Sequence, residues 1–314
     1  MICGTVSPDI FQQAMMMLST GESTEGLRLI KISADNGDPR AMNIYAKALK
    51  DGDIVERDVF EAHRYFVLAA EQGVDEAQYY VGMGHFLGLG ARQSFKDAIK
   101  WFRVSAEKGF PKAQYAMGQC YLNGYGVYKD IGFAKLWFTM AADKEYSTAR
   151  IALGDIYMDL HNPGRDYKEA ARLYTLAADA GDVDAYYKIA HCYHYGKGVP
   201  LNQHKAAQYF EKGCREGDRE CIFMLGQMYE KGQGVREDKD LGRQMIEEAS
   251  RLGSVAARSY LMGKLPNRKQ TSIIVNDVLD TPDVVAGFKG AEEMPSLFGR
   301  LKKKKKVASS NILL

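Results

Sequence analysis

Small and large apolar residues recur along most of this chain at a constant interval of 36 positions. The small residues at this interval are Gly26, Ala62, Ala98, Ala134, Ala170, Ala206 and Gly242. Large apolar residues follow three positions later, at Leu29, Tyr65, Trp101, Trp137, Leu173, Tyr209 and Met245. An interval of this length is typical of a helical repeat, so the pattern predicts about seven helical units in which the large apolar column is buried.

Polar residues and glycines mark where the helices of each unit begin and end. Six units carry Asp, Ser or Asn four positions before the small residue, at Asp58, Ser94, Asp130, Asp166, Asn202 and Asp238. These residue types cap helix N-termini, so a first helix of about 14 residues is expected to begin there. It should end at a glycine that can adopt a left-handed conformation, namely Gly37, Gly73, Gly109, Gly181, Gly217 or Gly253. A second helix follows directly.

Each second helix contains a small residue near its middle, at Gly82, Gly118, Gly154, Ala190 and Gly226. Glycine inside a helix costs about 1 kcal/mol relative to alanine. A compensating gain is therefore expected, and we predict that these positions allow close approach of a packed helix.

The segment AIKWFRVSAEKGFPKAQYAMGQCYLNGYGV, residues 98–127, resembles the Sel-1-like repeat family, a relative of the tetratricopeptide repeats. The resemblance covers roughly Gly26 to Gly263 and rests on a recurring Ala-x-x-Trp/Tyr-Phe-x-x-Ala-Ala motif. It implies an all-α fold, a right-handed α-solenoid or superhelix of antiparallel helix pairs, used as a scaffold or adaptor for protein complexes. Apolar residues at helical spacing between Pro8 and Ser19 predict an N-terminal capping helix within residues 1–21, ahead of repeats over residues 22–263. The prolines and the lack of sustained periodicity after Gly263 predict a mostly disordered tail over residues 264–314.

One unit departs from the pattern and supplies candidate partner-binding residues. It has Glu145 where the other units have glycine, and its closing turn, residues 159–165, lacks both turn glycines. Two interpretations remain open: a local turn variant, or a change of curvature that shapes a partner site containing His161 and Arg165. Tyr125 and Tyr128 lie in a turn where other units have polar or small residues, and such rings often dominate binding energy; exposed rings without function are the alternative.

Candidate chemistry is sparse, and we expect neither catalytic residues nor a bound cofactor or metal. His191, Cys192 and His194 form the densest cluster of metal-ligand types, but one helical turn does not provide four tetrahedral ligands. Cys214 and Cys221 replace alanines of other units, so we interpret them as buried small residues. The resemblance implies an alternative, because cysteine-rich secreted members of the family bridge their helices with disulfides.

Charge is concentrated at the C-terminal end of the 314-residue chain. From Arg268 onward there are nine Lys/Arg and five Asp/Glu, a net charge of +4, whereas the preceding 267 residues carry 33 and 35, a net charge of −2. A nearly neutral body argues against a nucleic-acid platform. The tail could contact an anionic membrane, nucleic acid or the nuclear import machinery through Phe298, Arg300, Lys302, Lys303, Lys304, Lys305 and Lys306.

These observations predict a protein–protein interaction scaffold that binds a partner protein or peptide on its repeat surface, and not an enzyme. The chain has no apolar run of about 18 residues and no secretory signal, so we expect a cytoplasmic monomer. Two other classes stay open. One is a hydrolase of the cysteine-rich type that the resemblance implies, and the other is a structural component that assembles with itself.

Overall fold

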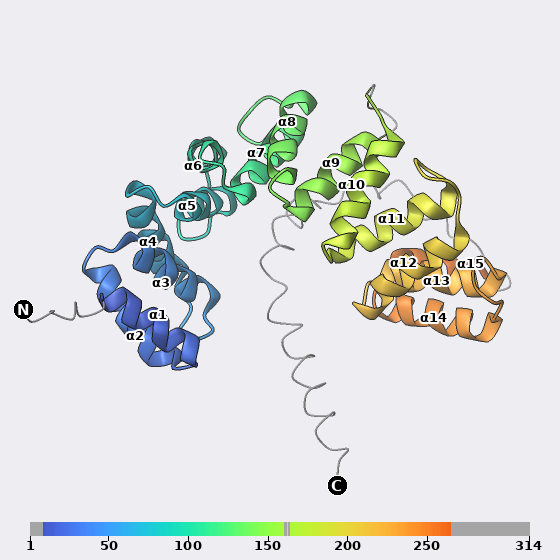
Figure 1. Cartoon of the computed structure of the whole chain (residues 1–314), viewed down its shortest axis with the longest axis horizontal. Coiled ribbons are helices and arrows are strands. Elements are labelled where there is room, and N and C mark those ends of the chain that lie inside the picture. The colour runs from blue at the N-terminus through green and yellow to red at the C-terminus, as the bar shows by residue number, and fades with distance from the viewer. Residues whose placement is uncertain (1–8, 160–161, 163, 265–314) are drawn as a thin grey trace, which may run out of the picture. The chain divides into compact units, whose positions relative to one another are not determined.

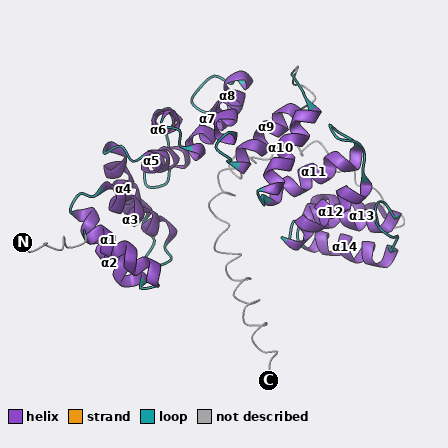
Figure 2. Cartoon of the chain, viewed as in Figure 1, coloured by secondary structure: helices purple, strands orange, loops and turns teal. Residues whose placement is uncertain are grey.

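The computed structural model describes residues 9–159, 162 and 164–264. Within these ranges the chain forms 15 α-helices and no strand (Figures 1 and 2). The helices are α1 (Ile10–Thr20), α2 (Ser23–Asp35), α3 (Pro39–Asp51), α4 (Val59–Glu71), α5 (Asp75–Leu87), α6 (Phe95–Glu107), α7 (Pro111–Asn123), α8 (Ile131–Ala142), α9 (Ser147–Met158), α10 (Tyr167–Asp179), α11 (Val183–Tyr195), α12 (Gln203–Arg215), α13 (Arg219–Lys231), α14 (Lys239–Arg251) and α15 (Val255–Lys264). We call them odd and even helices by their numbers.

The predicted helix caps are present in the structure. In each of the six even helices α4 to α14, the predicted Asp, Ser or Asn accepts a hydrogen bond from a backbone N–H of the first turn. Asp58, for example, accepts from Phe60 at 3.0 Å and Glu61 at 2.9 Å. These bonds satisfy N–H groups that have no partner within the helix, which fixes where each even helix begins.

The helix ends also follow the prediction. The glycines that follow the even helices have φ values between 86° and 98°. Glu145 occupies the same position after α8 with a φ of 62°, and it is the one residue other than glycine with a positive φ in the described ranges. The missing glycine therefore does not change the backbone, and this turn keeps the geometry of the others at the cost of a left-handed glutamate.

Consecutive helices pack against each other, and each odd helix packs more extensively against the even helix that follows it than against the one before. The pairs are thus α1–α2, α3–α4 and so on to α13–α14. The prediction placed the unit one helix later, joining α4 to α5 across the short glycine turn. That boundary was wrong because turn length does not determine which neighbour packs more closely.

The interior glycines explain this pairing. A Cβ atom at Gly118 of α7 would lie 2.5 Å from the ring of Phe138 of α8, and one at Gly154 of α9 would lie 2.6 Å from the ring of Tyr174 of α10. The missing Cβ gives room to a ring from the following even helix. A Cβ atom added at Gly226 would lie 2.9 Å from the carbonyl oxygen of Gly242, so the backbones of α13 and α14 meet there. The predicted close approach is present, and in most of these pairs it joins the backbone of the odd helix to an aromatic ring of the even helix.

The core column lies one position beyond the predicted one. Trp101 and Trp137 are only half-buried, as are most residues of the predicted column. The fully buried column is Ile30, Phe66, Phe102, Phe138, Tyr174, Phe210 and Ile246. Four of them, Phe102, Phe138, Tyr174 and Ile246, lie against the interior glycine of the preceding odd helix. In the predicted column only Tyr65 and Leu173 are buried.

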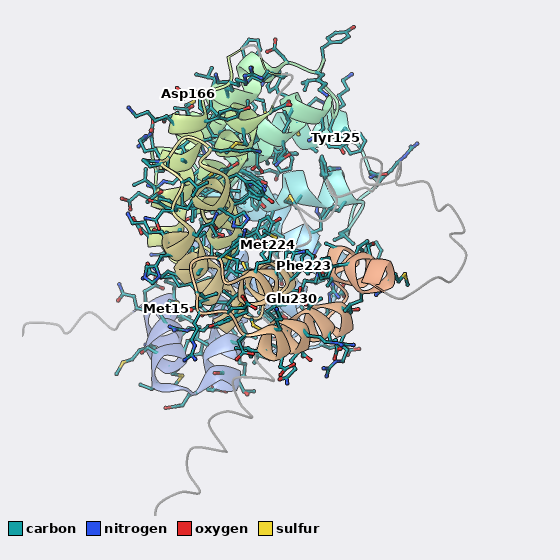
Figure 3. All side chains as sticks on the ribbon, turned by 90° about the vertical axis from the view of Figure 1, so that its right-hand side faces the viewer. Met15, Tyr125, Asp166, Phe223, Met224 and Glu230 are labelled. Atoms are coloured by element: carbon teal, nitrogen blue, oxygen red, sulfur yellow. The ribbon has the colours of Figure 1, made fainter. Side chains whose placement is uncertain are left out.

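At the N-terminal end, α1 packs against α2 and buries Ala14. At the other end, Phe223 and Met224 of α13 are buried, and Glu230 of the same helix accepts a 2.6 Å hydrogen bond from the Tyr260 hydroxyl of α15 (Figure 3).

The chain divides into two units, Met1–Met262 and Gly263–Leu314. The tail predicted from residue 264 onward, with its lysine run, lies outside the described residues beyond Lys264.

Candidate functional site

Tyr125 and Tyr128 lie in the turn between α7 and α8, in different surroundings. The Tyr125 ring (labelled in Figure 3) packs edge-on against Phe86 and tilted against Phe95, with centroid separations of 5.3 Å in both cases. Tyr128 is 96% exposed. Of these two candidates, Tyr128 is the one whose ring is open to a partner.

The turn between α9 and α10 contains the other two candidates. His161 lies outside the described residues. Arg165 is exposed, and its guanidinium carbon lies 5.9 Å from the Tyr167 ring centroid. Asn162 is buried and holds this turn, since its side-chain amide donates to the Ile156 carbonyl at 2.8 Å and its Oδ1 accepts from Gly164 N–H at 3.0 Å. A side-chain amide thus closes a turn that other units close with glycines. The tail candidates Phe298, Arg300 and Lys302–Lys306 also lie outside the described residues.

Three positions of every even helix face outward and together form a surface that we call the even-helix strip. The first position comprises Glu25, Glu61, Asp97, Phe133, Glu169, Lys205 and Leu241. The second, three residues later, comprises Arg28, Arg64, Lys100, Leu136, Arg172, Gln208 and Gln244. The third, four residues further, comprises Ile32, Leu68, Val104, Met140, Leu176, Lys212 and Glu248. Residues separated by three, four and seven positions share one face of a helix.

Four helices use the first two strip positions in the same way. In α2, α4, α6 and α10 an acidic residue forms an ion pair with a basic residue three positions later, at 2.7, 2.6, 2.9 and 2.6 Å. The third position carries an aliphatic side chain in these helices. Exposed ion pairs of this kind contribute little stability, and they leave a polar surface that favours contact with water.

Helix α8 replaces this ion pair with large apolar side chains. Phe133 and Leu136 occupy the two ion-pair positions and are 50% and 53% exposed, and Met140 follows at the third position with 38%. The Phe133 ring stacks on Tyr121 of α7, with centroids 5.1 Å apart and planes at 25°. One apolar face of α8 is therefore exposed, and its aromatic residue is already held in place. We call Phe133, Leu136 and Met140 the α8 patch.

The surroundings of the α8 patch extend it and frame it. Val104 of α6 and Leu176 of α10 are also exposed at the position equivalent to Met140. On the same two helices, the ion pairs Asp97–Lys100 of α6 and Glu169–Arg172 of α10 occupy the positions that Phe133 and Leu136 occupy on α8. An apolar centre with a polar rim is the arrangement found in protein interfaces. The 36-residue period gives no signal for this site, because the period is carried by positions that stay constant, whereas the site is marked by positions that change in one unit.

The described cysteines have raised thiol pKa values, the opposite of what activates a cysteine. Cys120, Cys192, Cys214 and Cys221 are free cysteines, and burial raises the pKa of Cys120 and Cys214 to about 12 and that of Cys192 to about 11. A thiol becomes a good nucleophile when its pKa is lowered, so these thiols lack that activation. Within the described ranges, no three His, Cys, Asp or Glu side chains are grouped so that they could hold a metal ion.

None of the described helices combines the length and the apolar character that crossing a membrane requires.

Comparison with known proteins agrees with the architecture. A family model described as Sel1 repeat matches six consecutive segments, 39–74, 75–110, 111–146, 147–182, 183–218 and 219–254. Each segment begins at an odd helix and ends just beyond the following even helix, in agreement with the pairing in the structure. No curated protein matches the chain.

Two solved structures are similar over most of the chain. A Sel1 repeat protein from Oxalobacter formigenes is 26% identical with a TM-score of 0.72, and the match covers 77% of this chain and 99% of that one. A protective antigen present in uropathogenic Escherichia coli strains, which displays an SLR fold, is 30% identical with a TM-score of 0.68. That match covers 75% of this chain and 50% of the antigen, so the present chain spans half of the antigen's length.

Proposed function

Because this chain belongs to the Sel1 repeat family, whose members generally mediate protein–protein interactions, we propose that it is a scaffold or adaptor that binds a partner protein through the even-helix strip. The observation that carries the proposal is the α8 patch. In four other even helices the same positions hold an ion pair, and α8 presents Phe133 and Leu136 there instead.

The energetics favour a partner with an apolar face. Burying the exposed half of Phe133 and of Leu136 would gain about 1 kcal/mol for each side chain. Phe133 already rests on Tyr121, so little side-chain entropy is lost when a partner covers it. Tyr128, three residues upstream of α8, adds an exposed aromatic ring whose hydroxyl can find a polar partner. The lysine run Lys302–Lys306 remains a proposed second contact with an anionic surface.

The proposal is tested by giving α8 the surface of its neighbours. The variant Phe133→Glu/Leu136→Arg of the 314-residue chain installs the ion pair that α2, α4 and α10 carry, so the fold should persist. Partners captured from the native cell with the wild-type chain and with the variant are compared by quantitative mass spectrometry. We expect at least one abundant partner to fall by about tenfold, the change that losing about 1.4 kcal/mol of binding energy produces.

The matched control is Arg243→Glu/Glu247→Arg, which reverses an exposed ion pair of α14 outside the strip positions and leaves α8 intact. This control should retain the partners. Equal capture by the wild type, the control and the α8 variant would refute binding through α8. Sedimentation of the wild type over a range of concentrations shows whether the α8 patch instead joins copies of this chain.

A further inference from the structure

A cavity of about 320 Å³ opens between α11 and α12, on the same strip but two even helices beyond the α8 patch. Its lining includes Tyr193 from α11 and Lys205, Tyr209, Lys212 and Arg215 from α12. Its volume is at the low end of the range for ligand-binding pockets. The cavity has room for a few side chains of a bound segment.

The cavity combines aromatic walls with cations that have no ion-pair partner in the described part of the chain. The rings of Tyr193 and Tyr209 are nearly parallel, with planes at 8° and centroids 6.0 Å apart. The Lys205 ammonium lies 5.3 Å from the Tyr193 centroid, and the Lys212 ammonium lies 5.0 Å from the Tyr209 centroid. No ion pair is found for Lys205, Lys212 or Arg215 among the described residues.

Comparison with the other even helices shows that this charge is specific to α12. Lys205 stands where α2, α4, α6 and α10 have Glu or Asp, and Lys212 stands where they have an aliphatic residue. Arg215 stands where the five preceding even helices have Asp or Glu, namely Asp35, Glu71, Glu107, Asp143 and Asp179. The helix thus places like charges three and seven residues apart on one face, where they repel each other. A bound anion would relieve that repulsion.

We infer that this cavity binds a short acidic segment of a protein, with carboxylates on Lys205, Lys212 and Arg215 and intervening carbon atoms on the faces of Tyr193 and Tyr209. Arginine presents a planar fork that matches a carboxylate, and lysine adds a mobile charge. Glu211 also lines the cavity, so three cations and one carboxylate leave a net charge of +2 there.

The neighbourhood favours a short acidic segment over a long polyanion. A nucleic acid would need a continuous basic surface, but the preceding even helix, α10, neutralises Arg172 with Glu169 at 2.6 Å. The following helix, α14, presents Leu241, Gln244 and Glu248 on its strip. Among the described strip positions, the basic residues without an ion pair are therefore confined to α12.

The test uses the whole 314-residue chain and a fluorescent ten-residue peptide of alternating Glu and Ala, with a Gln/Ala peptide as the neutral reference. Fluorescence anisotropy should show binding of the Glu peptide that weakens with added NaCl. The variant Lys205→Glu/Lys212→Leu gives α12 the residues of other even helices, and it should lose affinity by about tenfold or more. The variant Lys96→Glu/Lys168→Leu changes the net charge equally at exposed positions of α6 and α10, and it should bind like the wild type.

This design separates the cavity from the lysine run, which every variant retains. Binding of the Glu peptide that survives Lys205→Glu/Lys212→Leu would place the contact elsewhere and overturn the inference. Tighter binding of a ten-nucleotide oligothymidine than of the Glu peptide, lost in the same variant, would overturn it in favour of nucleic acid. The α8 variant Phe133→Glu/Leu136→Arg should bind the Glu peptide normally, so failure at one site is distinguishable from failure at the other. Circular dichroism checks that each variant is folded.

Discussion

At the scale of single residues, Glu145 shows how the repeat tolerates a substitution. It adopts a φ of 62° at the position where six other even helices are followed by glycine. A left-handed conformation costs a residue with a Cβ roughly 1–2 kcal/mol, and glycine avoids this cost. The turn is kept because the helices on both sides hold it.

We therefore expect Glu145→Gly to raise the free energy of unfolding by about 1 kcal/mol, because removal of strain exceeds the added entropy of the unfolded chain. Urea unfolding followed by circular dichroism measures the change. The control Glu145→Ala removes the same charge but keeps a Cβ, and it should give no gain. An equal gain in both variants would mean that the glutamate charge, and not the backbone, is responsible.

His191 provides a pH dependence at the same scale. Burial, together with nearby Lys197 and His194, lowers the pKa of His191 to about 4 from the usual 6.5. Between these two values the unfolded chain binds a proton that the folded chain does not, so acidification from pH 7 to pH 4.5 lowers the free energy of unfolding. The variant His191→Gln should lose less stability than the wild type over this range, as measured by urea unfolding at each pH. Parallel pH profiles would show that His191 does not contribute.

At the scale of helices, an odd helix and the even helix after it interlock through a ring placed over a small residue. A Cβ at Gly118 would meet three ring atoms of Phe138 at 2.5–2.9 Å, and Phe138 is fully buried and cannot move aside. Gly118→Ala should therefore destabilise the protein by about 1–3 kcal/mol despite the better helix propensity of alanine. Thermal unfolding measures this loss. Gly263→Ala, where no atom lies within 4 Å of the added Cβ, should cause no loss.

The helices also show which features a single sequence can predict. Caps such as Asp58 and turn glycines such as Gly73 were predicted correctly because they act on the backbone within a few residues. Burial was displaced by one position, from Trp101 to Phe102, because it depends on which neighbouring helix packs more closely. Of the predicted site residues, Tyr128 is exposed as expected, whereas Phe133 and Leu136 were missed because they resemble core residues until their exposure is known.

At the scale of the whole molecule, contacts run between consecutive helices, so each pair depends mainly on its neighbours. Deleting residues 183–218 removes α11 and α12 and joins Asp182 to Arg219. Asp218, which normally precedes Arg219, caps α13 as Asp182 caps α11. We expect this variant to fold cooperatively, with less helix and a smaller urea m-value because less surface is buried. It should also lose the binding of the acidic peptide.

Deleting residues 183–200 is the matched control, because it removes α11 alone and places two even helices in succession. Without an interior small residue to receive Phe210, this variant should unfold at a much lower temperature or aggregate. Similar stability of the two deletions would show that the alternation of odd and even helices is not what holds the fold together.

The even-helix strip has a consequence for how this protein can evolve. Its three positions per helix lie outside the core, so under the proposed function we expect substitutions there to alter specificity with little effect on folding. A duplicated helix pair keeps the core residues that fold it. We expect a change at its few strip positions to be enough to give the copy a different ligand. Under the proposed function and the further inference, the apolar α8 and the basic α12 are two such changes on one backbone, and each helix pair can gain a specificity while the others retain theirs.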